Sequence, residues 1–275
     1  MEQPRYLILE NGQVFRGRPL GKSGQVIAEI VFTTAMTGYL ETLTDPSYYG
    51  QMVVQAFPLI GNYGVIPADF EAEQPALKGY IVRSWCQVPS NFRSEEDLDT
   101  FLLSKGIVGL WDIDTRALVK IIREHGVMNA LLTDDPTPDE ATLARLRAYR
   151  IDRAVQAVSQ SEPGLQRAEA AKLHVALWDF GAKRNIAREL NKRGCDVTIL
   201  PAHTTAEEIL ALKPDGLMLS NGPGDPAENT DIIHELNLLC ESKLPIFGIC
   251  LGHQLLALAR GGETMKLKYG HRGAN

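Results

Sequence analysis

The 275 residues are enough for one large or two ordinary domains, each with its own hydrophobic core. Apolar residues make up 44% and charged residues 23%, which is an ordinary globular composition, and the net charge is −6. This acidic balance, with no stripe of Lys and Arg, argues against a nucleic-acid ligand.

The first residues and the cysteines bear on where the protein works. The chain does not open with a basic start followed by an apolar core, and no apolar run approaches the roughly 20 residues of a membrane helix. The cysteines do not pair at metal-ligand spacing, so we expect reduced thiols and no bound metal. The four positions are Cys86, Cys195, Cys240 and Cys250. These features predict a cytoplasmic protein that does not contact a membrane.

The first half of the chain begins with stretches typical of strands. Residues 5–17 alternate around Asn11-Gly12, a strong signal for a hairpin with a two-residue turn. Residues 24–34 and 78–85 are rich in β-branched side chains and predict further strands.

Two later segments of the first half have the boundary residues of capped helices. Residues 94–106 start at Ser94 with an acidic residue three positions on, and end at Lys105-Gly106. Residues 114–126 have the same start and stop chemistry. Strands and helices together predict a mixed α/β domain over residues 1–152.

The second half has a different rhythm. Residues 153–172 are polar and weakly patterned, which predicts a linker. Short apolar runs then alternate with helical segments without a break. The expected strands are 173–180, 196–201, 216–220, 244–249 and 264–270, and the expected helices are 182–194, 204–214, 230–243 and 251–262. This alternation predicts an α/β domain over residues 173–275, with a parallel sheet covered on both faces.

Cys250 stands between a strand and a helix, with glycine two positions to either side. The pattern G-x-C-x-G at Gly248 and Gly252 is the cysteine version of the G-x-S-x-G elbow, in which the two flanking positions press together. A helix that starts at Leu251 aims N–H groups and its positive end at the sulfur, which lowers the pKa of the thiol. The alternative is that Cys250 is a small buried core residue.

A second loop is expected at the same edge of the sheet. The segment "NGPGDP" follows the strand at 216–220, and strands consecutive in sequence often lie side by side in a parallel sheet. The N–H of Leu251 and a donor from this loop then stabilise an oxyanion, since Gly222 and Gly224 allow close approach of backbone to substrate. The alternative is that this segment is only a turn, because Asn-Gly and Pro-Gly commonly form turns.

Two polar residues follow in the first turn of the elbow helix. His253 is a candidate base, but a side chain in that turn usually points away from the sulfur. We therefore interpret His253 as a packing residue or as a hydrogen-bond partner of residues at the site. Gln254 can reach back to a polar substrate.

Several motifs together resemble a known family. "FGICLGHQ" with "LSNGPGDP" is similar to the class I, triad-type glutamine amidotransferases. "MTGYLETLTDPSYYGQ", "GNYG", "SNFR", "DIDTRALVKIIRE" and "WDFGAKRNI" resemble the small, glutamine-hydrolysing subunits of carbamoyl phosphate synthetases. The likeness covers essentially the whole chain, and it implies a Rossmann- or flavodoxin-like parallel sheet in the C-terminal domain.

The resemblance implies a chemistry that agrees with the elbow. Cys250 would attack the side-chain amide of L-glutamine and release ammonia from a thioester. Gly222 and Leu251 match the oxyanion donors of the family, and Lys183 matches a position near the site. The positions that the resemblance assigns to glutamine binding are Ser47, Gly222, Gly224, Leu251 and Gln254.

The resemblance also implies a partner and a pathway. Ammonia would pass to a large subunit, which carries the ATP-dependent steps with Mg²⁺ and bicarbonate, so we expect no cofactor on this chain. The N-terminal domain would dock on that subunit and contribute Ser47 to the glutamine pocket. The product would serve arginine and pyrimidine biosynthesis.

One departure from the family concerns the base. In the family a His and a Glu, two residues apart, follow well beyond the elbow, whereas here only His253 and His271 follow Cys250 and neither begins a His-x-Glu pair. His271 lies in a segment that precedes the triad histidine in the family. We therefore expect a C-terminally truncated, incomplete amidotransferase domain that is inactive by itself.

Two other functions stay open on the residues alone. One is a cysteine hydrolase that uses the same elbow on another amide or an ester. The other is a non-catalytic docking subunit whose cysteine is structural.

Overall fold

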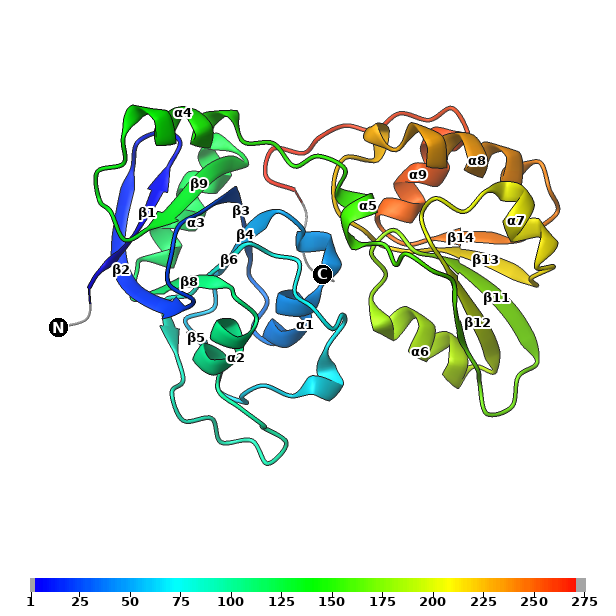
Figure 1. The fold of residues 1–275 in the computed structure, drawn as a ribbon, viewed down its shortest axis with the longest axis horizontal. Helices are drawn as coiled ribbons and strands as arrows, with labels where there is room; N and C mark the ends of the chain where they lie inside the picture. The colour runs from blue at the N-terminus through cyan, green and yellow to red at the C-terminus, as the bar shows by residue number, and fades with distance from the viewer. Residues whose placement is uncertain (1–2, 271–275) are drawn as a thin grey trace. The chain divides into compact units, whose positions relative to one another are not determined.

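The computed structural model describes residues 3–270, and these form two units that both mix helices and strands, as predicted. The barrel unit comprises the described residues up to Ile151 together with those from Lys266 onward, and the sheet unit comprises Asp152–Met265 (Figure 1). Within residues 3–270, no helix has both the length and the apolar character needed to cross a membrane.

Seven strands of the barrel unit close into a barrel in the order β1-β2-β8-β6-β4-β3-β9. The pairs β3–β4, β4–β6 and β6–β8 are parallel and the other pairs are antiparallel. The strands are β1 (Arg5–Leu9), β2 (Val14–Gly21), β3 (Val26–Thr33), β4 (Gln51–Gln55), β6 (Gly79–Ile81), β8 (Val108–Trp111) and β9 (Met128–Thr133). Closure leaves none of these seven strands with an unpaired edge.

Helices and short elements complete the barrel unit. They are α1 (Tyr39–Thr44), α2 (Leu98–Ser104), α3 (Thr115–His125), α4 (Glu140–Ala148), two 3₁₀ turns (Pro46–Tyr48 and Pro67–Asp69) and the paired strands β5 (Leu59–Ile60) and β7 (Ser84–Trp85). Alternate residues of β4 serve two cores: Val53 packs in the core that includes α1 and α2, whereas Met52 and Val54 pack in the core that includes α3. This division follows from the two-residue period of a strand.

Two features of the barrel unit differ from the predictions. The first hairpin forms, but Leu9 N–H bonds to Gln13 O, so three residues turn the chain with Gly12 at φ 87° instead of two. Helix α2 is capped by Asp97, which accepts from Thr100 N–H at 2.9 Å, rather than by Ser94, whose hydroxyl donates to Glu96 O. The helix is therefore shorter than predicted, because the carboxylate that caps its first N–H groups belongs to a residue about one turn after Ser94.

The cap of α3 is as predicted, and the strand expected at 264–270 does not form. Asp114 accepts from Ala117 N–H at 3.0 Å, and Gly126 follows the helix at φ 95°. Val127 N–H donates to Lys268 O, so the segment from Lys266 bonds within the barrel unit instead of extending the other sheet. His271 lies outside the described residues.

A five-stranded sheet with the order β10-β12-β11-β13-β14 organises the sheet unit. All neighbours are parallel except β10, which runs antiparallel to β12. The strands are β10 (Gly164–Gln166), β11 (Leu173–Trp178), β12 (Cys195–Leu200), β13 (Gly216–Leu219) and β14 (Ile246–Gly248). Residues 153–172, where we expected a linker, therefore contain β10 and also α5 (Ala154–Val158).

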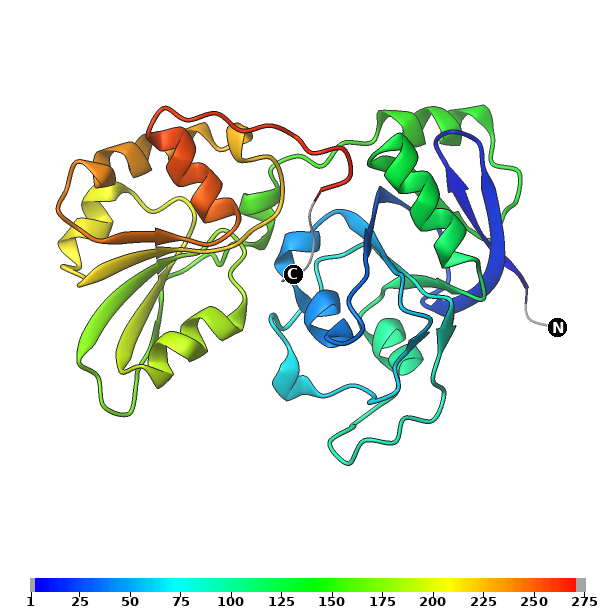
Figure 2. The same ribbon diagram turned by 180° about the vertical axis from the view of Figure 1, so that it is seen from behind.

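Helices cover both faces of this sheet, as the alternating pattern predicts (Figures 1 and 2). One face packs against α7 (Ala206–Ala211), α8 (Thr230–Cys240) and α9 (Leu251–Ala259). The other face packs against α6 (Arg184–Lys192), whose Ala187 is buried with Leu177 and Val197. A 3₁₀ turn at Pro226–Glu228 precedes α8.

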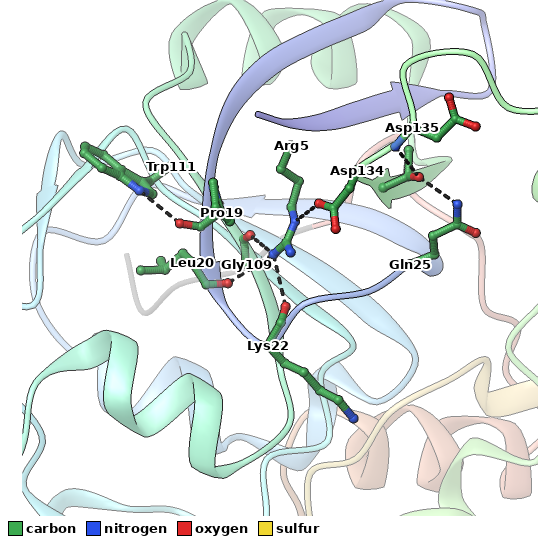
Figure 3. Close-up of polar contacts among 10 residues, drawn as sticks. Arg5, Pro19, Leu20, Lys22, Gln25, Gly109, Trp111, Asp134 and Asp135 are labelled. Carbon is green, nitrogen blue, oxygen red and sulfur yellow. Dashed lines mark hydrogen bonds and ion pairs between the residues drawn. The ribbon is translucent and has the colours of Figure 1, made fainter. Parts of the chain in front are cut away.

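A buried arginine ties four segments of the barrel together (Figure 3). Arg5 is 1% exposed; its Nε donates to Asp134 Oδ1 at 2.8 Å. Its Nη1 donates to the carbonyls of Leu20, Lys22 and Gly109 at 3.3, 3.1 and 2.9 Å. One side chain thus donates to acceptors in β2, in β8 and in the segments that follow β2 and β9. Carbonyl groups buried away from water need such a donor.

We expect Arg5→Met to destabilise the protein by about 3 kcal/mol, because three carbonyls and one carboxylate lose their donor at once. The matched change Asp134→Asn should cost about 1 kcal/mol or less, because Asp134 is 41% exposed and water replaces the lost charge interaction. Urea unfolding of both variants measures the difference. Equal losses would show that the carbonyl contacts contribute nothing beyond the ion pair.

Candidate active site

The two loops singled out in the sequence leave the same edge of the sheet. Strands β13 and β14 are parallel neighbours, with Leu217 opposite Ile246 and Leu219 opposite Gly248. The segment "NGPGDP" follows β13, and Cys250 follows β14 after one residue. Open α/β sheets bind ligands at this carboxyl edge.

The backbone at Cys250 has the geometry of an elbow. Cys250 lies at φ 52° and ψ −110°, a conformation that side-chain-bearing residues rarely adopt, and it directly precedes α9. The residue is exposed, so the alternative of a buried core cysteine is wrong. The turn thus presents the sulfur at the start of a nine-residue helix.

The flanking glycines allow close packing at the elbow, Gly248 against the first turn of α9 and Gly252 against the end of β13. A Cβ added at Gly248 would lie 2.6 Å from His253 N, and one added at Gly252 would lie 2.6 Å from Leu219 Cβ. Gly252 N–H donates to Ser220 O at 3.0 Å, which holds the first turn of α9 against the end of the neighbouring strand. Side chains at either glycine would force the two segments apart.

Gly222 lies directly beside the elbow. A Cβ added there would come 2.7 Å from Leu251 Cδ2 and 3.0 Å from the carbonyl carbon of Phe180. Among the hydrogen bonds of residues 3–270, none is donated by the N–H of Gly222 or Leu251. Two backbone donors on adjacent segments are therefore available to an incoming oxygen.

Gly224 borders a cavity within the sheet unit. It adopts φ 86°, and a Cβ added to it would lie 3.0 Å from Ala154 Cβ. The cavity has a volume of about 360 Å³ and is lined by residues 152–156, 223–225, 228, 229 and 231. In the part of the chain that the structure describes, no group of His, Cys, Asp and Glu side chains is arranged to hold a metal ion.

The remaining predicted site residues have defined places, but their roles stay predictions. His253 and Gln254 are exposed in the first turn of α9, and Gln254 N–H donates to Cys250 O. Lys183 is the residue before α6 and is half-buried. Ser47 belongs to the barrel unit, where its N–H donates to Asp45 Oδ1 at 2.9 Å.

Three buried polar residues that support the site were not singled out from the sequence. Asp179 accepts from the N–H groups of Gly181 and Ala182 and from that of Gln160. Ser220 and Asn221 connect the loop after β13 to the loop after β11. Their position was the available signal, because Asp179 and Ser220 come directly after an apolar strand run and Asn221 follows Ser220.

Comparisons with known proteins agree with this architecture. A family model described as "Carbamoyl-phosphate synthase small chain, CPSase domain" matches residues 7–132. A second, described as "Glutamine amidotransferase class-I", matches residues 176–275.

Curated relatives match along nearly the whole chain, and three from different bacteria are each named carbamoyl phosphate synthase small chain. The protein of Listeria monocytogenes serotype 4b (strain F2365) is 50% identical over 98% of this chain and 74% of its own length. That of Clostridium perfringens (strain 13 / Type A) is 50% identical over 98% and 76%. That of Chlorobaculum tepidum is 49% identical over 100% and 76%.

We expect Gly252→Ala to destabilise the protein by about 2–4 kcal/mol, because the methyl group meets the backbone and Cβ of Leu219, which cannot move freely. The control is Gly164→Ala in β10, where the nearest atoms to an added Cβ lie 3.8 Å away in a flexible side chain. It should change stability by less than about 1 kcal/mol. Thermal and urea unfolding report both values, and a tolerated Gly252→Ala would contradict the tight elbow.

Proposed function

The chain belongs to the carbamoyl phosphate synthase small-chain family and contains a class I glutamine amidotransferase domain, and from this premise we propose that it hydrolyses L-glutamine at Cys250. The observation that supports this most directly is the exposed, positive-φ cysteine next to the two unused backbone donors of Gly222 and Leu251. A nucleophile beside an oxyanion-binding pair is the arrangement that acyl transfer requires.

The proposed reaction proceeds in two steps. The Cys250 thiolate attacks the amide carbon of the glutamine side chain, and the carbonyl oxygen becomes an oxyanion that accepts from Gly222 and Leu251 N–H. Collapse of this intermediate breaks the C–N bond, ammonia leaves with a proton delivered by a general acid, and a thioester remains. Water then attacks the thioester carbon and releases glutamate and the thiolate.

We propose roles for the other positions on the strength of the family resemblance and of their places in the structure. Gln254 lies one helical turn after Cys250, and Gly224, in the loop after β13, lines the cavity. Both positions therefore suit contacts with the polar ends of glutamine. For Ser47 the support is the family resemblance alone, which assigns its hydroxyl a contact with glutamine. Lys183 and His253 would support residues at the site rather than react.

The proposed partner is a carbamoyl phosphate synthase large subunit, since the family consists of small chains. Ammonia released at Cys250 would be used there in ATP-dependent synthesis of carbamoyl phosphate, with Mg²⁺ and bicarbonate bound to that subunit. The barrel unit, which the small-chain family model matches over residues 7–132, would provide the docking surface.

We expect a chloromethyl ketone analogue of glutamine to alkylate Cys250 first and glutamine to slow that reaction. Cys240 is the internal control, because burial raises the pKa of its thiol and lowers its thiolate fraction. Peptide mass mapping of the alkylated chain, alone and with excess glutamine, measures the selectivity. Equal labelling of Cys250 and Cys240, or labelling that glutamine does not slow, would favour a structural cysteine or a hydrolase with a different substrate.

The base for this chemistry is the subject of a second test. After Cys250 the 275 residues contain no His-x-Glu pair. We therefore expect these residues, assembled with a large subunit, to turn over glutamine negligibly, and the same chain extended by family sequence carrying such a pair to be active. The measurement is glutamate formation by the two assemblies side by side.

The outcome also separates the docking alternative from the catalytic one. If the 275-residue chain is as active as the extended chain, the base lies within it, and His253→Ala should then abolish turnover. If neither chain turns over glutamine but both bind the large subunit in a pull-down, the chain is a docking subunit.

A further inference from the structure

We propose that Ser220 is a positioning residue: its hydroxyl fixes the peptide plane that carries the N–H of Gly222 and so sets the direction of this oxyanion donor. The inference rests on the proposed function, because it concerns the donor that would face the glutamine carbonyl. Ser220 itself lies too deep to touch a substrate, since it is 0% exposed.

The side chain of Ser220 contacts the peptide unit that follows it. Ser220 Oγ donates to Asn221 O at 2.7 Å. Asn221 C=O and Gly222 N–H belong to the same planar trans peptide group and point in opposite directions. Whatever holds that carbonyl oxygen therefore also holds the N–H of Gly222.

The same hydroxyl is anchored from its other side. Phe180 N–H, in the loop after β11, donates to Ser220 Oγ at 2.8 Å. With this acceptor role filled, the hydroxyl proton is directed to Asn221 O. One buried side chain thus connects the β11 loop to the peptide plane of the oxyanion donor.

A second side chain keeps the β11 loop in place for this contact. Asn221 is 3% exposed; its Nδ2 donates to Gly181 O at 2.9 Å and its Oδ1 accepts from Lys183 N–H at 3.0 Å. Only an amide offers a donor and an acceptor in this arrangement. The loop that anchors Ser220 is therefore tied to the residue after Ser220.

The packing of Gly222 explains why small movements matter. Gly222 fits between the backbone of Phe180 and the side chain of Leu251, with no room for a methyl group on either side. Loss of the Ser220 hydroxyl leaves two buried backbone groups, Phe180 N–H and Asn221 C=O, without that partner. Rotation of the Asn221–Gly222 peptide to find new partners would turn the donor away from the oxygen it is to bind.

The test compares two electrophiles at the same sulfur. A chloromethyl ketone analogue of glutamine passes through an oxyanion when the thiolate adds to its carbonyl, before the S–C bond to the methylene carbon forms and chloride leaves. Iodoacetamide reacts by direct displacement of iodide and forms no oxyanion. The ratio of the two alkylation rates of Cys250 in the full chain therefore reports the oxyanion donors and cancels changes in thiolate fraction.

We expect Ser220→Ala to lower the saturating rate with the ketone by about tenfold or more, to leave its half-saturating concentration unchanged, and to leave the iodoacetamide rate within about twofold. Ser159→Ala is the matched control. Ser159 Oγ also accepts a backbone N–H from another loop, that of Ala202, and donates to the next carbonyl, that of Gln160, but it adjoins no oxyanion donor. It should leave both alkylation rates at the wild-type values.

A folded Ser220→Ala chain with the wild-type rate ratio would overturn the inference. If that variant does not unfold cooperatively, Asn221→Asp serves instead. It keeps the shape of the side chain and the acceptor for Lys183 N–H but loses the donor to Gly181 O. An unchanged ratio of the two alkylation rates in this variant would also overturn the inference. Failure of the proposed function is distinguishable, since wild-type Cys250 would then show neither saturation by the ketone nor protection by glutamine.

Discussion

The close contact between the elbow and β13 is the constraint on which the candidate site depends. Cys250 can keep a positive φ only because the residues around it are held by neighbours: Gly252 lies against Leu219, and its N–H bonds to Ser220 O. Strain of this kind persists where the surrounding packing determines the backbone. The parallel pairing of β13 with β14 brings both loops to this contact.

Buried polar side chains extend the same constraint to the loop after β11. Asp179 accepts from the N–H of Gln160, and Ser220 and Asn221 bond backbone groups of the loop after β11. Three segments therefore hold one another. Buried polar groups need such partners, and networks in which each member is satisfied make a loop rigid. The peptide group of Gly222 is thereby held in place, as the proposed role of its N–H group requires, because dipoles fixed in advance stabilise developing charge most effectively.

Local sequence signals predicted the sheet unit better than the barrel unit, for a physical reason. In β11 to β14 each strand is a mostly apolar run followed by a helix, and a parallel sheet between helices is the regular way to bury such runs. In the barrel unit, β2 pairs with β8 and β3 pairs with β9, strands that are distant in sequence, and no local pattern specifies those partners or the closure between β1 and β9. The prediction of a strand at 264–270 was wrong for a related reason. Lys268 O accepts from Val127 N–H, and a local pattern does not reveal a partner so distant in sequence.

By itself, the sequence located the candidate site and the family. It showed a cysteine between two glycines at a strand-to-helix junction, a glycine-rich loop after the preceding strand, and the family to which both motifs belong. These are short-range properties, because a tight turn and a helix start depend on residues within a few positions of each other. Only the tertiary structure decided which segments lie against the elbow and what holds them. Those contacts join Phe180, Ser220 and Leu251 across three loops, and their geometry arises from burial and strand register, which no single segment encodes.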